Sequence, residues 1–300
     1  MKKTILILCG ILVAIYLVFS LIDTGEYRVE KRLWRMQKKF SVVAQDPKAV
    51  PRSQFESLVK DYRKLIKKYP KSRYVPQMYS RIGSLYLLSE NYDEARKAFG
   101  DVVRHYADNQ EIASKAMMDI GNTYLMQKER SRAIDVYRTI WKDYERTEVG
   151  FMMPLYIAGV FRNDGQNEMM TSYLNEAVAF YRKIINNKEE EEFMRLNAYQ
   201  MLATAYLGLE KWQLAFNTLK DLLYRFADSR AMTPQRLSII TRMINVTAVV
   251  RLQDYDKAIH LYQEFIDGHP GHYLNQFLQK VVESLNYLKE NRPGAVVPQQ

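Results

Sequence analysis

Cysteine and glycine are both scarce in this chain. Cys9 is the only cysteine among 300 residues, so no intramolecular disulfide can form and cysteine use does not indicate a redox compartment. Glycine contributes 12 residues, about 4% against a usual share of roughly 7%, whereas tyrosine contributes 22. This composition suits packed helices better than hairpins and β-sandwiches, and it predicts an all-α protein.

Residues that carry catalysis or bind metals are also few. The chain has four histidines, and His269 and His272 flank Pro270 and Gly271, so we expect that pair in a surface turn and not on one helical face, as a zinc site on a helix requires. The sequence contains no glycine-rich phosphate loop, and Cys9 lies inside an apolar segment. We therefore expect no catalytic residue, no metal site, no cofactor and no small-molecule substrate.

The excess of positive over negative charge is confined to one part of the chain. The formal net charge is +10, but residues 24–75 hold 15 Lys/Arg against 5 Asp/Glu, whereas residues 76–300 hold 27 against 28. A basic segment next to an apolar one favours a membrane surface, since anionic headgroups attract Lys and Arg; the alternative is the solvated face of two basic helices. We expect no nucleic-acid binding, because an exported patch would not meet nucleic acid. The expected membrane-surface patch comprises Lys31, Arg32, Arg35, Lys38, Lys39, Lys64, Lys67, Lys68 and Lys71.

An uncharged apolar run spans residues 4–22 and follows Lys2 and Lys3. As a helix it would be roughly 28 Å long, enough to cross a bilayer core. We expect an uncleaved signal anchor over residues 1–23 in a bacterial inner membrane, with cleavage after Ser20 as the alternative. The two lysines favour export of the remainder to the periplasmic side, although basic residues on the other flank leave a cytoplasmic location open.

Two segments thirty-eight residues apart have nearly the same pattern: IGSLYLLSENYDEARKAFGDVVRHY from Ile82 and IGNTYLMQKERSRAIDVYRTIWKDY from Ile120. A fixed period of this kind indicates a helical solenoid. A third unit follows from Tyr199, and a fourth, degraded in its first helix, ends at Pro270. The positions that recur are Gly83, Tyr86, Ala95 and Phe99; Gly121, Tyr124, Ala133 and Tyr137; Ala203, Tyr206 and Ala215; and Ala258, Tyr262 and Pro270.

Further helices extend this pattern in both directions. A helix over residues 27–44 and another over 53–70 are expected upstream, separated by Pro47 and Pro51. Between the second and third units, Ala158 and Phe161 followed by Ala177, Tyr181 and Ile184 predict a unit whose turn is enlarged around residues 162–167. A helix over 273–290 is expected to cap the array, and the Pro/Gly/Gln-rich tail 291–300 to be disordered.

These units resemble the tetratricopeptide repeat, a hairpin of two antiparallel helices, A and B. The resemblance covers residues 50–272. The arrangement of the chain resembles that of anchored bacterial envelope proteins that act in outer-membrane protein assembly, in cell division or beside a translocon. It implies basic membrane-proximal helices with a first, half-conserved repeat over 24–75, and an array over 76–272.

The resemblance also implies where a partner would bind, because tetratricopeptide arrays use the concave groove lined by their A helices. Those positions are Gln77, Ser80, Ser84, Leu87 and Leu88; Lys115, Met118, Asn122, Leu125 and Met126; and Asn197, Gln200, Thr204 and Leu207. Amides mixed with Met and Leu suit an extended peptide or a partner helix, although the Met and Leu side chains could instead pack against neighbouring repeats. Ser80 and Ser84 stand where a carboxylate clamp would begin, so an acidic C-terminal tail is not expected in this groove.

The sequence therefore predicts a non-enzymatic, membrane-anchored scaffold that binds other proteins in the bacterial envelope. The alternative is an envelope protein that binds anionic lipid or another polyanion through the basic segment 28–73.

Overall fold

The computed structural model describes residues 26–291, and all regular structure in that part of the chain is helical. The all-α prediction is confirmed for these residues. The expected anchor, residues 4–22, and nearly all of the tail 291–300 lie outside them. No helix within 26–291 combines the length and the apolarity that crossing a bilayer requires.

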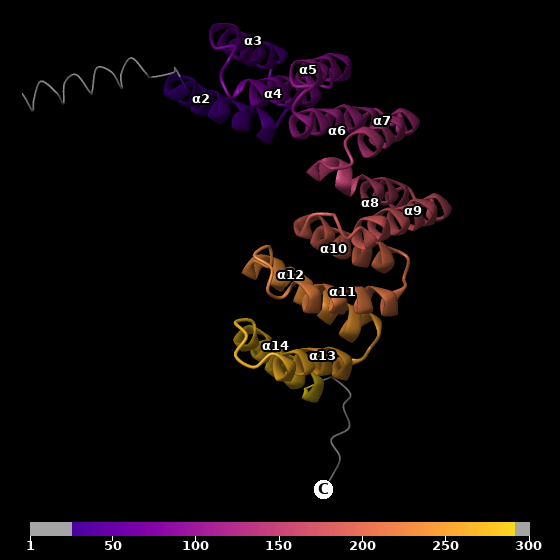
Figure 1. The fold of residues 1–300 in the computed structure, drawn as a ribbon. Helices are drawn as coiled ribbons and strands as arrows, with labels where there is room; N and C mark the ends of the chain where they lie inside the picture. Colours follow the sequence, from indigo (N-terminus) through magenta and orange to yellow (C-terminus); the bar gives the residue numbers. More distant parts are fainter. Residues whose placement is uncertain (1–25, 292–300) are drawn as a thin grey trace, which may run out of the picture. The chain divides into compact units, whose positions relative to one another are not determined.

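The helices fall into two compact units, which divide between Met153 and Pro154 inside α8 (Glu148–Asn163) (Figure 1). Unit 1 contains α2 (Glu26–Gln45), α3 (Arg52–Lys68), α4 (Val75–Leu88), α5 (Tyr92–His105), α6 (Gln110–Met126) and α7 (Arg130–Asp143). Unit 2 contains α9 (Asn167–Asn186), α10 (Glu192–Gly208), α11 (Trp212–Phe226), α12 (Pro234–Asn245), the π-helix η1 (Val246–Arg251), α13 (Tyr255–Gly268) and α14 (Asn275–Glu290).

The crossing of the two helices in each clear hairpin is set by a small residue beneath a large one. A Cβ built on Gly83 would overlap the ring of Phe99, and one built on Gly121 would overlap the ring of Tyr137. In α10 and α11 of unit 2 the same two places hold Ala203 and Leu219, both fully buried. A smaller side chain on helix B thus accompanies an extra methyl on helix A, as close packing requires.

The basic N-terminal helices are folded into unit 1. Val29, Met36 and Phe40 of α2 share one hydrophobic cluster with buried residues of α3 and α4. The Glu26 carboxylate accepts hydrogen bonds from the Ser72 hydroxyl (2.9 Å) and from the Arg73 backbone N–H (3.3 Å), which ties the start of α2 to the loop before α4. Both helices lie where the sequence placed them, and Pro51 directly precedes α3.

A three-residue turn joins the two helices of five hairpins, from α4–α5 to the hairpin of the π-helix and α13, and its middle residue has a positive φ. The residues concerned are Glu90, Lys128, Gly165, Glu210 and Gln253. In the first turn the Asn91 N–H donates to the Tyr86 carbonyl, and in the second Glu129 donates to Tyr124, so the left-handed residue satisfies carbonyls at the end of helix A.

The expected enlarged turn after α8 is wrong. α8 ends at Asn163 and α9 begins at Asn167, because Gly165 adopts a φ of +70° and closes the chain as tightly as in the other hairpins. Counted from this turn, Met170, Leu174 and Ala177 occupy the helix B positions that the sequence had assigned to Ala177, Tyr181 and Ile184. The additional residues lengthen α9, which has 20 residues where α5 has 14.

The degraded helix A of the last hairpin contains a π-helix. The Asp254 N–H donates to the Ala248 carbonyl, six residues back, whereas the equivalent bonds in the other hairpins span five. One extra residue is therefore accommodated inside the helix, where π-geometry absorbs it. This insertion explains why the signature is out of register there.

Lys128→Gly is expected to raise the free energy of unfolding of unit 1 by about 1 kcal/mol. A side chain with a Cβ is strained at φ +64°, and glycine removes that strain at a smaller cost in unfolded-state entropy. Urea unfolding of the full chain measures the change. Lys97→Gly, at an exposed site inside α5, is the control and should lower stability by a similar amount; a loss of stability in both variants would contradict the strained-turn explanation.

Candidate partner-binding surfaces

In unit 1 the expected groove residues lie on α4 and α6, which contact each other. Gln77, Lys115 and Met126 are exposed, and Met126 is the most open of the apolar ones, with 53% of its surface accessible. The remaining groove residues are half-buried: Ser80, Ser84, Leu87, Leu88, Met118, Asn122 and Leu125. The two A helices therefore present a face on which exposed and partly covered apolar and polar side chains are mixed.

Several polar groups on this face are already bonded within the chain. The Asn122 side-chain oxygen accepts a hydrogen bond from the Tyr137 hydroxyl at 2.8 Å, and the Ser84 hydroxyl donates to the Ser80 carbonyl at 2.9 Å. The Lys115 ammonium lies 3.2 Å from the Glu148 carboxylate. The side chains most open to a partner on this face are therefore Gln77 and Met126.

Asp119 is a groove residue that the sequence reasoning missed. It lies between Lys115 and Asn122 at helical spacing, so it shares their face of α6. Burial raises its pKa from 3.8 to about 6. A lone Asp in a helix reads as a solvated surface residue, and only the packing around it reveals the desolvation.

Asp119→Asn is expected to stabilise unit 1 above pH 6 and to leave it unchanged near pH 4. The folded-state pKa is the higher one, so both states hold the proton at low pH, and the fold loses stability as pH rises through about 6, by about 3 kcal/mol in total. Denaturant unfolding of the full chain between pH 4 and pH 8 tests this. Asp135→Asn, at an exposed site on α7, is the control; the prediction fails if the gain is the same at every pH.

In unit 2 the expected groove residues on α10 differ in their surroundings. The Asn197 side-chain oxygen accepts a hydrogen bond from the Arg236 guanidinium at 2.8 Å, and burial lowers the pKa of that arginine. Gln200 is half-buried, and its carbonyl accepts from the exposed Thr204 hydroxyl at 3.0 Å. Asn197 therefore links α10 to α12, and Thr204 lies closer to open surface.

Thr204 opens onto a hollow of about 300 Å³ that the sequence did not indicate. Its walls come from α8, α9, α10, the start of α11 and the π-helix, and they are mostly apolar. Arg162 and Arg251 also line the hollow, and the Arg251 guanidinium lies 4.9 Å from the centre of the Trp212 ring. Val246, the first residue of the π-helix, lines the same space and has 42% of its surface accessible.

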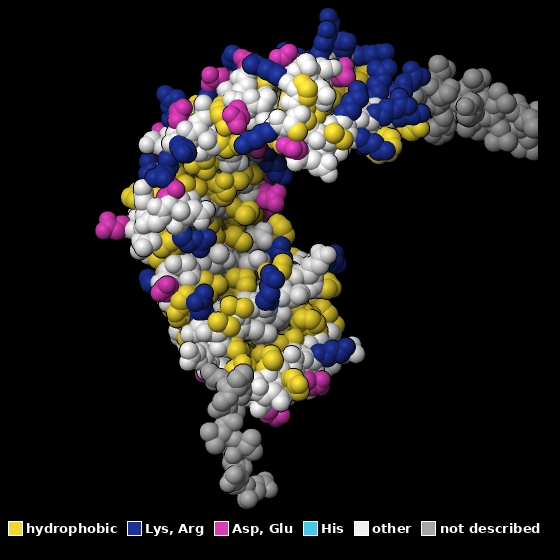
Figure 2. All heavy atoms as spheres, turned by 180° about the vertical axis from the view of Figure 1, so that it is seen from behind, with side chains coloured by type: hydrophobic (Ala, Val, Ile, Leu, Met, Phe, Trp, Pro, Cys, Tyr) yellow, Lys and Arg dark blue, Asp and Glu magenta, His cyan; other side chains and the backbone are white. Residues whose placement is uncertain are grey.

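All nine residues of the expected basic patch are exposed. Figure 2 shows Lys and Arg side chains gathered over α2 and α3. Three of the nine have neighbours of their own: the Lys39 ammonium lies 3.8 Å from the Asp61 carboxylate, Lys38 lies 3.8 Å above the Trp34 ring, and Lys68 lies 5.7 Å above the Tyr69 ring. The segment is therefore both basic and accessible.

His269 and His272 lie in the turn between α13 and α14, as expected; Pro270 and Gly271 of that turn are exposed, and both histidines are half-buried. His272 has only 10% of its side chain exposed and lies 3.0 Å from the Asp228 carboxylate, and His269 stacks on Phe265. Phe265 and Tyr273 pack against the His272 ring and hold the turn against α13, while Tyr273 keeps 62% of its surface accessible. Within residues 26–291 no cluster of His, Cys, Asp and Glu has the arrangement of a metal site.

Comparison with known proteins supports the repeat assignment. The model of the tetratricopeptide repeat family matches residues 81–141, which span α4 to α7. A comparison with curated proteins finds no match.

Two solved structures are similar to the chain. BtubC (BKLC) from P. vanneervenii is 11% identical over 88% of this chain and 98% of its own, with a TM-score of 0.46. The C-terminal part of a TPR repeat-containing protein from Cytophaga hutchinsonii is 17% identical over 79% of this chain and 84% of its own, with a TM-score of 0.41.

Proposed function

We propose that this protein is a non-enzymatic scaffold that is anchored in the bacterial inner membrane and holds a partner protein on its A helices. The observation that carries the proposal is the accessible face of α4 and α6, on which Gln77 of α4 and Met126 of α6 are exposed and Asn122 lies one helical turn before Met126. Flexible methionine adapts to varied apolar side chains, and amides bond a peptide backbone.

The chemistry of this face indicates what the partner carries. Lys115 is paired with Glu148, so the acidic group of Asp119 is the one left to attract charge from outside. A partner segment with apolar side chains and a Lys or Arg beside them would complement Met126 and Asp119. Pairing with a cation would also return the Asp119 pKa toward its usual range.

The hollow in unit 2 is a second place for apolar side chains. Its apolar walls around Thr204 would take the side chains of an extended segment, and Arg162 and Arg251 would attract carboxylates beside them. Each unit thus offers an A-helix surface of its own, with opposite charge preferences.

A pull-down from crosslinked membranes with the intact chain tests the scaffold. Met126→Glu places a charge on the exposed apolar site and should reduce recovery of the partner by about tenfold, whereas Lys142→Glu on α7 should leave it unchanged. Recovery that is the same from both variants would reject the A-helix face. Asn122→Ala is less clean, because it also removes the acceptor of the Tyr137 hydroxyl.

The envelope location rests on residues 1–23 and on the basic segment that follows, which suits the headgroup region of an inner membrane. A reporter active only in the periplasm, fused after Gln300 and compared with one active only in the cytoplasm, determines the side of the membrane. Activity of the cytoplasmic reporter alone would overturn the periplasmic assignment.

A second candidate function is binding of anionic lipid or another envelope polyanion through residues 28–73, favoured by the exposure of all nine basic residues. Co-sedimentation with anionic vesicles should then be lost on reversing the charge at Lys64, Lys67, Lys68 and Lys71, and should weaken with salt. Co-sedimentation that survives the charge reversal would eliminate this function.

A further inference from the structure

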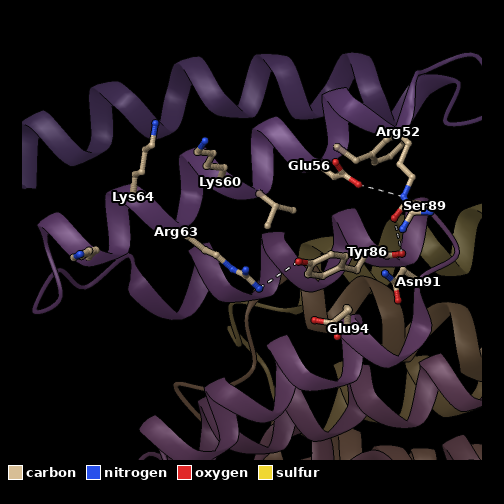
Figure 3. A pocket seen from close by; sticks show the side chains of 12 residues that line it. Arg52, Glu56, Lys60, Arg63, Lys64, Tyr86, Ser89, Asn91 and Glu94 are labelled. Atoms are coloured by element: carbon tan, nitrogen blue, oxygen red, sulfur yellow. Dashed lines mark hydrogen bonds and ion pairs between the residues drawn. The ribbon is translucent and has the colours of Figure 1, made fainter.

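A recess of about 560 Å³ lies in unit 1 between α3 and the turn that joins α4 to α5 (Figure 3). It lies apart from the groove residues of α4 and α6. Phe55 and Val59 of α3 are apolar members of its lining, and the Tyr86 ring, Ser89 and Asn91 stand across from them. The volume is in the range of sites that take several amino-acid side chains or a mid-sized ligand.

Cations dominate the lining of this recess. Five basic side chains of α3 contribute to it: Arg52, Lys60, Arg63, Lys64 and Lys67. The two carboxylates present are both paired, Glu56 with Arg52 at 3.3 Å and Glu94 with Lys97 at 2.5 Å. Among the described residues, Lys60, Lys64 and Lys67 form no ion pair.

The three lysines without an ion pair are spaced with the periodicity of an α-helix. Lys60, Lys64 and Lys67 are spaced by four and three residues, which places them along one side of α3. Figure 3 shows Arg63 pointing across the recess to Tyr86, whose hydroxyl accepts its hydrogen bond at 3.2 Å, whereas Lys60 and Lys64 point away from Tyr86. The arginine thus forms part of the wall, and the lysines form a flexible cationic rim.

From this geometry we infer that the recess binds an acidic peptide segment of a partner protein, with carboxylates on the lysine rim and an apolar side chain against Phe55 and Val59. The row of lysines extends over about 10 Å of helix, which matches an extended chain with several carboxylates and exceeds a single phosphate. The recess is walled by α3 on one side and by the α4–α5 turn on the other, so a flat bilayer surface reaches the rim and not the apolar lining. Asn91 supplies an amide for the peptide backbone.

A direct binding measurement tests this site in the intact chain held in neutral phosphatidylcholine nanodiscs. The probe is a fluorescent peptide in which Glu alternates with Leu and Ser, and its counterpart with Gln in place of Glu is the uncharged control. We expect the Glu peptide to bind, the Gln peptide not to bind, and the affinity to fall as salt is raised.

Three variants locate the binding. A triple variant of α3 should weaken peptide binding by about tenfold, since each substitution removes one charge from the lysine rim; its substitutions are Lys60→Gln, Lys64→Gln and Lys67→Gln. A matched triple variant of α2 should change the peptide affinity by less than about twofold; its substitutions are Lys31→Gln, Arg32→Gln and Arg35→Gln. Asn91→Trp fills the recess without changing the charge and should also abolish binding; thermal unfolding checks that each variant is folded.

Three results would overturn the inference. Equal losses in the α2 and α3 triples would show attraction to net charge alone, and normal binding by Asn91→Trp would place the peptide outside the recess. If the α3 triple instead lost binding to phosphatidylglycerol vesicles and kept the peptide, the lysines would serve a lipid surface. None of these results bears on the A-helix scaffold, which the Met126 variant tests separately.

Discussion

Gly83→Ala is expected to destabilise unit 1 by about 3 kcal/mol, although alanine is the better helix former. The added methyl would overlap the ring of Phe99, which is buried and surrounded by close-packed side chains, so the ring cannot swing aside. α4 and α5 would have to move apart. Urea unfolding of the full chain measures the loss.

A second substitution should relieve the clash, because it produces a residue pair that already occurs in a hairpin of unit 2. Phe99→Leu in the Gly83→Ala background recreates the pair formed by Ala203 and Leu219 in unit 2. The single Phe99→Leu change should cost about 1 to 2 kcal/mol, and the double variant should be more stable than the sum of the two losses by at least about 1 kcal/mol.

Gly100→Ala is the control for this cycle. Gly100 lies in the middle of α5, and a Cβ there meets only the end of the Arg104 side chain at 3.7 Å. Alanine at that site should therefore stabilise by about 1 kcal/mol. If the losses of stability from Gly83→Ala and Phe99→Leu simply add in the double variant, the packing of a small residue beneath a large one would be contradicted.

Gly150→Ala is the second substitution with a large expected effect, a loss of about 3 kcal/mol or more. A Cβ on Gly150 would overlap the backbone carbonyl of Tyr144, which belongs to the C-terminal end of α7. The overlap cannot be relieved by moving a side chain, because the atom that the Cβ meets belongs to the backbone. The Thr147 hydroxyl accepts the Gly150 N–H at 3.0 Å, so the clash also strains the cap that starts α8.

Hydrogen exchange measured by mass spectrometry should show the damage in residues 144–153, where backbone amides lose protection. Gly159→Ala is the control in the same helix, because nothing lies within 4 Å of its added Cβ, and it should stabilise by up to about 1 kcal/mol. Unchanged protection in Gly150→Ala would show that the α7–α8 junction is looser than described.

The hairpins of unit 1 could be predicted from the sequence because their recurring residues are the ones that set the crossing. Gly83, Phe99, Gly121 and Tyr137 are fixed by contact, so their spacing reports the packing directly. The α8–α9 hairpin could not be placed, because Ala177 and Tyr181 repeat the pattern two turns later in a longer helix, and only the φ of Gly165 determines the register.

The candidate sites were harder to predict for a related reason. The exposed groove residues follow from helical spacing, but the hydrogen bond from Arg236 to Asn197 and the desolvation of Asp119 depend on neighbours from other helices. The recess beneath α3 combines residues more than twenty positions apart, Arg63 and Tyr86, which no local pattern joins. The π-helix arises from one inserted residue, which has no signature of its own.

Site-specific photocrosslinking in intact cells tests the central claim most directly. A photoreactive amino acid at Met126 lies on the proposed groove face, and one at Lys142 lies on the exposed surface of α7. We predict that one partner protein is crosslinked through position 126 and not through 142, and that the adduct is lost when Asp119→Asn and Gln77→Ala are added. Equal crosslinking from both positions, or crosslinking from 142 alone, would contradict a scaffold that binds through its A helices.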